Sequence, residues 1–403
     1  MYRRLWIALV VSLGVLLFSC GTKESPAEDS DEVQERVESK PSTYSQETRD
    51  GVIFVHNTGP RWGDTPQTRL ELIRVLGGAG DSGPDMTFYK PADIALDTQG
   101  NLYVLDAGNF RIKKIGTDGE LQAAYGREGQ GPGEFQFMEG IALDEQGRMY
   151  VSDKATNAVK ILNPEGKEVG TMPSGGPAGR LARLTAGDLV SLRTTNSSRA
   201  LLQRFDPEGK VEAEFGALEA HEDEDSFRYF NRVSFASGPD DSVYIAYAAR
   251  NRIEKYSSEG ELRLSLDRPL NFPESETITH EEHQFGPRKI PIPFVNFASA
   301  DIAVDDQARL WVLSYERQLK FEEMGLTMHF RDGDGRYEGA ETLQATDEIK
   351  IDAFAFHIFD AQGRFLGKVP LTHHAGVVRI FHDRLYILEP RHAMCVYTYR
   401  IVE

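Results

Sequence analysis

Cysteine is almost absent from this chain, because only Cys20 and Cys395 occur among its 403 residues. A small exported domain stapled by disulfides needs several pairs, so the chain is not of that class and must depend on a core. The sequence also lacks zinc-spaced cysteines, a Gly-x-Ser-x-Gly motif, a phosphate-binding loop and a His-Glu-x-x-His motif. Common hydrolases and nucleotide-dependent enzymes usually carry one of these, which argues against those classes.

Positive charge is also scarce. The chain has 45 Lys and Arg residues against 63 Asp and Glu residues, a formal net charge of −18. Such a charge repels phosphate backbones and anionic lipid surfaces. Nucleic acid is therefore not an expected partner.

Long apolar runs are missing apart from one at the start, from Leu5 to Phe18. This run follows Arg3 and Arg4 and is short for a membrane span. A basic start, a short apolar run and small residues after it are typical of a secretion signal. Residues 1–19 are thus predicted to be a signal peptide.

The residues after the apolar run, Leu17-Phe18-Ser19-Cys20-Gly21, resemble a bacterial lipobox. In that motif the cysteine carries lipid and becomes the first residue of the mature protein. The resemblance implies lipidation of Cys20 and attachment to a membrane of the bacterial cell envelope, and Gly21 favours the outer membrane. Ordinary cleavage nearby, which would leave Cys20 as a free thiol, remains the alternative.

Residues 20–50 are acidic and poor in aromatic residues, which predicts a disordered tether. A short amphipathic helix around residues 32–38 is an alternative for part of it. The remaining residues, 51–403, are enough for one large all-β domain or two smaller ones.

An internal repeat dominates residues 51–403. The stretch "PADIALDTQGNLYVLDAGNFRIKKI" (91–115) matches "FMEGIALDEQGRMYVSDKATNAVKI" (137–161), and weaker copies follow. Each copy has four short apolar stretches separated by turns such as Asp97-Thr-Gln-Gly100, in which Asp bonds to the backbone and Gly accepts positive φ. Six second strands align at Leu102, Met149, Leu189, Val243, Leu310 and Leu385.

Four-stranded antiparallel units that repeat every 40 to 50 residues or so are typical of propeller blades. The last copy lacks a fourth strand, and residues 70–76 are expected to supply it and close the ring. The fold class predicted is therefore an all-β, six-bladed β-propeller.

The stretch 91–115 resembles an NHL-type repeat, and residues 51–403 resemble the six-bladed β-propeller lipoproteins of bacterial cell envelopes. The resemblance implies the fold. It implies little about activity, because such propellers serve as binding modules, scaffolds and occasional enzymes.

Two sets of loops should lie on one face of the propeller: those from an outer strand to the next inner strand, and those from a second to a third strand. Propeller ligands usually occupy this face. Asp106, Asn109 and Arg111 fall in such a loop, but similar residues recur in other blades. Recurrence favours a structural role, in which these side chains anchor the loops.

Residues that break the repeat on this face are better candidates for a ligand site. They are Lys90, Glu139, Arg180, Asn231, Arg232, Tyr247, Tyr315, His373 and His374. Their mixed chemistry suits an anionic or sugar-like ligand, and the partner expected at this face is a protein, a peptide or a carbohydrate.

A metal site is not favoured, and no cofactor is predicted. The pairs His280/His283 and His373/His374 come without a carboxylate motif, and residues 331–339 only partly match a calcium loop. A long insertion in the fifth blade, about 318–352, could be a lid or a docking element. The sequence favours a binding or scaffolding module, and the alternative is a propeller enzyme of the lyase or lactone hydrolase type with a metal or a histidine in its channel.

Overall fold

The computed structural model describes residues 42–78, 84–173, 178–185, 187–193, 199–285, 288–324, 327–331, 337–342 and 351–403. Residues 42–403 form one compact unit, and residues 1–41 lie outside the described residues. The predicted signal peptide and Cys20 therefore also lie outside them. Among the residues described, no helix is both long and apolar enough to cross a membrane.

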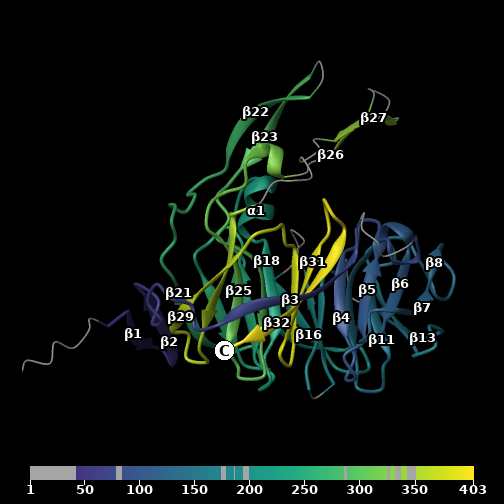
Figure 1. The fold of residues 1–403 in the computed structure, drawn as a ribbon, viewed down its shortest axis with the longest axis horizontal. Coiled ribbons are helices and arrows are strands. Elements are labelled where there is room, and N and C mark those ends of the chain that lie inside the picture. Colours follow the sequence, from purple (N-terminus) through teal and green to yellow (C-terminus); the bar gives the residue numbers. More distant parts are fainter. Residues whose placement is uncertain are drawn as a thin grey trace, which may run out of the picture. The chain divides into compact units, whose positions relative to one another are not determined.

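Residues 42–403 form a six-bladed β-propeller, as the sequence predicts (Figure 1). Blades 1 to 3 consist of β4 (Asp93–Leu96), β5 (Leu102–Asp106), β6 (Arg111–Ile115), β7 (Leu121–Tyr125); β10 (Met138–Leu143), β11 (Met149–Asp153), β12 (Ala158–Leu162), β13 (Glu168–Pro173); and β14 (Leu181–Arg183), β15 (Leu189–Leu192), β16 (Leu202–Phe205), β17 (Val211–Phe215). Blades 4 to 6 consist of β18 (Val233–Ser237), β19 (Val243–Tyr247), β20 (Ile253–Tyr256), β21 (Leu262–Asp267); β24 (Ser299–Val304), β25 (Leu310–Tyr315), β28 (Phe354–Phe359), β29 (Phe365–Leu371); and β30 (Val377–Phe381), β31 (Arg384–Glu389), β32 (Cys395–Val402), β3 (Arg69–Gly77).

The ring closes as predicted. Strand β3 pairs antiparallel with β32, from Arg69 opposite Val402 to Gly77 opposite Cys395, and so supplies the fourth strand of blade 6. The predicted alignment of second strands is also confirmed, since five of the six residues begin their strands and Leu385 is the second residue of β31.

The core is divided among the blade interfaces. One cluster of buried apolar side chains lies between each pair of neighbouring blades, including blades 6 and 1. Trp311 of β25, for example, packs edge-on against Phe356 of β28 and belongs to the cluster between blades 5 and 6. Because each blade packs on two neighbours, closing the ring by β3 completes the last interface.

The prediction of a disordered tether to residue 50 is wrong at its end, because Tyr44–Arg49 forms strand β1. Strand β1 pairs with β2 (Val52–Asn57), and β2 pairs parallel with β21 of blade 4. The polar strand β1 is ordered because β2, with Val55 in the core, is fixed on the edge of this blade.

The N-terminal segment then continues to blades 5 and 6. The backbone N–H groups of Arg61 and Trp62 donate to the carbonyl oxygens of Phe365 and Leu366 in β29. The segment from β1 to β3 therefore joins three consecutive blades, and we call residues 42–68 the clasp.

Several insertions lie on one face of this unit, at the top of Figure 1. Helix α1 (Glu224–Phe230) precedes blade 4, and the hairpin of β22 (Thr279–Phe285) and β23 (Arg288–Phe294) precedes blade 5. Between β25 and β28 lie the short helix η3 (Phe321–Glu323) and the hairpin of β26 (Thr327–Arg331) and β27 (Tyr337–Thr342), within the predicted insertion. The central part of the calcium-like stretch, residues 332–336, lies outside the described residues.

The remaining short elements are η1 (Pro84–Met86), η2 (Ala107–Asn109), β8 (Arg127–Glu128) and β9 (Glu134–Phe135).

Candidate functional site

The recurring aspartates at the ends of second strands are loop anchors. Buried Asp106 accepts hydrogen bonds from the backbone N–H of Tyr89 (2.6 Å) and from the side chains of Asn109 and Arg111 (both 2.9 Å). Asp153, its equivalent in blade 2, accepts from the backbone N–H groups of Gln136 and Phe137. Each aspartate thus holds the chain that crosses from the preceding blade, which confirms the structural role expected from recurrence.

This anchor is replaced in blades 3 to 6. The strand registers place Arg193, Tyr247, Ser314 and Glu389 at the position of Asp106. Ser314, and not Tyr315, is therefore the equivalent of the aspartate in blade 5. In blade 6, Glu389 accepts from the N–H groups of its own loop at Arg391, His392, Ala393 and Met394. The crossings into blades 4, 5 and 6 are not held by an anchor aspartate, and they surround a pocket.

The mouth pocket is a cavity of about 360 Å³ on the face that carries the insertions. Its walls come from the end of α1, the return of β23, the end of β25, the helix η3 and two loops of blade 6. Three predicted candidates, Arg232, Tyr315 and His374, meet here. The size lies within the range of small-molecule sites.

A continuous series of ring contacts forms one wall of the mouth pocket, and we call it the aromatic arc. Its successive rings are Tyr229, Phe297, Tyr315, Phe354, His374 and His392, with centroid separations of 6.1, 6.0, 4.9, 6.5 and 4.0 Å. Aromatic rings in such contact make a stiff apolar surface that costs little conformational entropy to present.

Both carboxylates of the mouth pocket are already satisfied. Burial alone would raise the pKa of Glu389, but hydrogen bonds from His392 and from the backbone lower it to about 2. Glu323 accepts two hydrogen bonds from Arg317, at 2.7 and 2.9 Å, and this pairing lowers its pKa. Both groups therefore remain ionised and engaged at neutral pH.

The two histidines of the arc are held differently. Burial, together with the neighbouring His392, lowers the pKa of His374 to about 4, so this ring is neutral at pH 7. The Nδ1 atom of His392 lies 3.2 Å from Glu389, and we assign the proton to Nδ1 because the carboxylate can only accept. The Nε2 atom of His392 is buried and has no hydrogen-bond partner among the described residues.

Two arginines of the mouth pocket make no ion pair with any residue that the structure describes. The guanidinium of Arg232 lies over the ring of Phe297, 5.4 Å from its centroid. Arg391 donates only a long hydrogen bond, 3.4 Å, to the carbonyl oxygen of Met324. Burial raises the pKa of Tyr315, and the positive charges of Arg232 and Arg391 both act against that rise.

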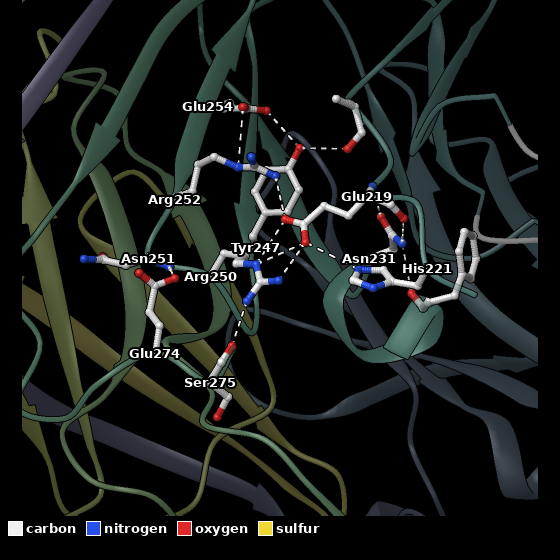
Figure 2. Close-up of polar contacts among 12 residues, drawn as sticks. Glu219, His221, Asn231, Tyr247, Arg250, Asn251, Arg252, Glu254, Glu274 and Ser275 are labelled. Atoms are coloured by element: carbon white, nitrogen blue, oxygen red, sulfur yellow. Dashed lines mark hydrogen bonds and ion pairs between the residues drawn. The ribbon is translucent and has the colours of Figure 1, made fainter. Parts of the chain in front are cut away.

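A polar network behind the mouth pocket fixes two of its walls (Figure 2). Glu219, just before α1, accepts hydrogen bonds from Arg250 at 2.8 and 3.1 Å. Arg250 also donates to the carbonyl oxygen of Ser275 (2.9 Å), on the segment that leads into β22. The backbone N–H of Asn251 donates to Glu274 on the same segment. Helix α1 and the β22–β23 arm are thus tied to one loop of blade 4.

Two predicted candidates belong to this network and do not face a ligand. Asn231 is buried and bonds to the backbone of Glu219 and Phe227. Tyr247 is fully buried, donates to Glu254 (2.9 Å) and is covered by Arg252, 3.8 Å from its ring centroid. Asn231 and Tyr247 break the repeat because the hydrogen-bond network at this loop of blade 4 differs from that of the other blades. Their prediction as ligand-face residues is therefore wrong.

Three other candidates lie outside the mouth pocket. Lys90 is exposed beside Tyr89, Glu139 pairs with Lys154 at 2.6 Å, and His373 bonds to the hydroxyl of Tyr399 at 2.7 Å.

The last candidate, Arg180, lies in the central channel. The registers align six positions around the channel, occupied by Asp93, Gly140, Arg180, Ser234, Asp301 and Val377. Two residues further along, five inner strands have alanine and the sixth has Arg379. Arg379 was missed from the sequence, although its place among the alanines is a signal that could have revealed it.

The charged residues of the channel neutralise one another. Arg180 pairs with Asp301, and Arg379 pairs with Asp93 and, at 3.8 Å, with Asp301. Asp93 and Asp301 also accept from the backbone N–H groups of Ile141 and Val378 in the next blades. We call Asp93, Arg180, Asp301 and Arg379 the channel tetrad. Its two arginines line, together with the alanines, a cavity of about 260 Å³ that is separate from the mouth pocket.

Within the described part of the chain, no group of three or more His, Cys, Asp or Glu side chains is arranged to hold a metal ion. Of the histidines considered for a metal, His283 stacks on Phe321 at 3.5 Å and His280 lies 3.9 Å from Asp225.

Comparisons with known proteins support the fold. A model of the NHL repeat matches residues 88–115. No curated protein matches the chain. A member of the DUF4221 family from Bacteroides vulgatus is 10% identical, with 83% of this chain and 99% of that chain covered and a TM-score of 0.52.

Two further solved structures match with lower TM-scores. An exported protein of Bacteroides fragilis is 11% identical over 86% of this chain and 98% of its own, with a TM-score of 0.48. Virginiamycin B lyase from Staphylococcus aureus is 12% identical over 83% and 100%, with a TM-score of 0.44. At these identities the similarity concerns the fold alone.

Proposed function

We propose that this chain is a binding module whose ligand site is the mouth pocket. The observation that carries the proposal is the aromatic arc. Its rings come from three crossings between blades, from β25 and β28, and from the loop between β31 and β32, and together they present an apolar wall on the insertion face. A protein, peptide or carbohydrate could place a side chain or sugar ring against this wall.

The proposal includes the location of the module. Lipid on Cys20 would hold it in the bacterial cell envelope, on the outer membrane, with the propeller presenting the mouth pocket to its partner. The lipobox-like residues 17–21 support this location. Replacing Cys20 by Ser should release the protein from the membrane fraction, and retention of C20S there would count against lipidation.

Filling the mouth pocket should abolish binding. Ala375 lines the pocket and is partly buried, so Ala375→Trp would place an indole against the arc. A library of peptides and oligosaccharides is screened by thermal shift against the wild type and A375W. A ligand at 100 times its Kd stabilises the folded state by about 2.7 kcal/mol, which is readily measured.

The control for this screen is Val211→Trp, on an exposed position of β17 in blade 3. We expect compounds that raise the Tm of the wild type and V211W and leave A375W unchanged. Compounds that act equally on all three proteins, or no compound at all, would argue against the mouth pocket as the ligand site.

A second candidate function is catalysis by a propeller enzyme of the lyase or lactone hydrolase type. Glu389 orients His392 through Nδ1 and leaves Nε2 free at the pocket wall, which is the arrangement of a general base. His392-dependent turnover of a lactone panel, lost in His392→Gln, would favour this function over pure binding. Turnover that is absent or unchanged in H392Q would eliminate it.

A further inference from the structure

The mouth pocket holds two cations whose charge is opposite to that of the protein. The chain carries a formal net charge of −18. In the pocket, Glu323 forms an ion pair with Arg317, and Glu389 accepts hydrogen bonds from His392 and from backbone N–H groups. Arg232 and Arg391 remain without an acidic partner among the described residues. The pocket therefore offers two unneutralised guanidinium groups in an acidic protein.

These guanidinium groups stand beside the aromatic arc. Arg232 covers Phe297, and Phe297 contacts Tyr315 at 6.0 Å. Arg391 follows Pro390 in a loop of blade 6 that lines the same pocket, next to His392. A ligand that lies on the arc would thus have guanidinium groups of the same pocket beside it.

Guanidinium groups bind carboxylates through charge-assisted hydrogen bonds, which are roughly twice as strong as neutral ones. A neutral partner would leave the two positive charges partly desolvated without compensation. The Nε2 atom of His392, which has no hydrogen-bond partner among the described residues, can accept from a donor on the ligand.

We propose that the mouth pocket binds an organic carboxylate, with the anion held by Arg232 and Arg391 and an adjoining aromatic or apolar group laid on the aromatic arc. This inference rests on the proposed binding function and narrows its ligand class. The carboxylate could belong to a free acid or to the C-terminus of a peptide, and both have the same chemistry at the site.

The test uses a matched pair of probes, N-acetyl-L-phenylalanine and its carboxamide, which differ only in the charged group. Isothermal titration of the full chain should show the acid binding about tenfold more tightly than the amide, equivalent to about 1.4 kcal/mol. A rising salt concentration should weaken the binding of the acid and leave the affinity of the amide unchanged.

Variants then locate the anion. Arg232→Gln and Arg391→Gln should each reduce the affinity of the acid towards that of the amide and leave the amide within twofold. Arg69→Gln is the matched control, because Arg69 is exposed on β3 and pairs with Glu71, and neither residue lines the mouth pocket. Its affinity for both probes should equal that of the wild type.

The sources of the carboxylate are separated by a third probe, a tripeptide that ends in phenylalanine. Tighter binding of the tripeptide than of the acid assigns the site to peptide C-termini, and the reverse order assigns it to free acids.

Three outcomes would overturn the inference: equal affinity for acid and amide, tighter binding of phenyl phosphate than of the acid, and no binding of either matched probe. If acid and amide bind equally and both are lost in A375W, the carboxylate is wrong and the binding function stands. The library screen with A375W does not depend on charge, so it tests the binding function separately.

Discussion

At the scale of single residues, one position decides where the loop face is closed and where it is open. Asp106 and Asp153 each bind the backbone of the crossing that precedes their blade. In blade 6 the same position is Glu389, whose longer side chain bonds to its own loop. The extra methylene group of glutamate thus changes which backbone groups the carboxylate binds. The crossing at His374 is not held by this carboxylate, and it lines the mouth pocket.

Buried His357 provides a prediction at this scale. Its Nε2–H lies 2.6 Å from Glu316, which Lys368 also contacts at 2.9 Å, and burial lowers the pKa of His357 to about 4. The folded-state value lies below the unfolded value of about 6.5, so the folded state takes up this proton less readily. His357 therefore stabilises the fold fully above pH 6.5, and this contribution falls as the pH drops towards 4.

We expect His357→Gln to be less stable than the wild type at pH 7.5, with the difference narrowing by about 2 kcal/mol at pH 4.8. Urea unfolding at the two pH values measures it. His382→Gln, at an exposed position, should follow the wild type at both. A constant difference between H357Q and wild type would show that His357 does not titrate in this window.

At the scale of elements, the clasp joins the outer edges of blades 4, 5 and 6. The four-stranded repeats alone would not connect these edges. Asn57 is its central contact, because it is buried, donates to the carbonyl oxygens of Asp267 and Gly363, and accepts from the backbone N–H of Phe365. These bonds connect β2 to blade 4 on one side and to blade 5 on the other.

Asn57→Ala should lower the free energy of unfolding by about 2 to 3 kcal/mol, since it leaves three buried backbone groups without their partner. Chemical denaturation compared with Ser45→Ala, an exposed position on β1, measures the effect. A loss below about 0.5 kcal/mol in N57A would mean that the clasp contributes little to stability.

The clasp also shows what the sequence could and could not predict. The blades were predictable, because Asp and Gly turns and alternating apolar residues are local signals. Strand β1, "YSQETR", has no such signal, and the partner of its hairpin is β21, about two hundred residues away. Its order is a tertiary effect that composition does not report.

The candidate site was predictable where it depends on the repeat. Arg232 and His374, which break the repeat, do meet in one pocket with Tyr315, although Ser314 and not Tyr315 holds the aspartate position in blade 5. Tyr229 and Phe297 were missed because they lie in crossings that have no equivalents in other blades. Tyr247 was a wrong candidate, because a residue that breaks the repeat can have a structural role instead of a ligand-binding one. Burial distinguishes the two roles, and the sequence alone does not report it.

At the scale of the whole molecule, the channel tetrad joins inner strands of the ring, and its two arginines help to line the alanine-lined cavity. Its members come from blades 1, 3, 5 and 6, so it also connects inner strands that are not neighbours. Buried pairs of this kind add little stability compared with apolar packing, but removal of one partner is costly because a buried charge is left alone.

Arg379→Ala is therefore expected to destabilise the propeller by about 3 kcal/mol at pH 7.5, against less than about 1 kcal/mol for the exposed control Arg263→Ala. Burial raises the pKa of Asp93 and Arg379 acts against that rise, so the variant should raise this pKa further. A raised folded-state pKa means that the folded protein binds the proton more tightly than the unfolded chain. The loss of unfolding free energy in R379A should therefore shrink as the pH falls from 7.5 towards 5.

The double variant R379A/D93N, which removes the unpaired charge, should be more stable than R379A at pH 7.5, as measured by urea unfolding. A deficit that does not change with pH, together with no recovery in the double variant, would show that Arg379 acts by packing and not by neutralising Asp93.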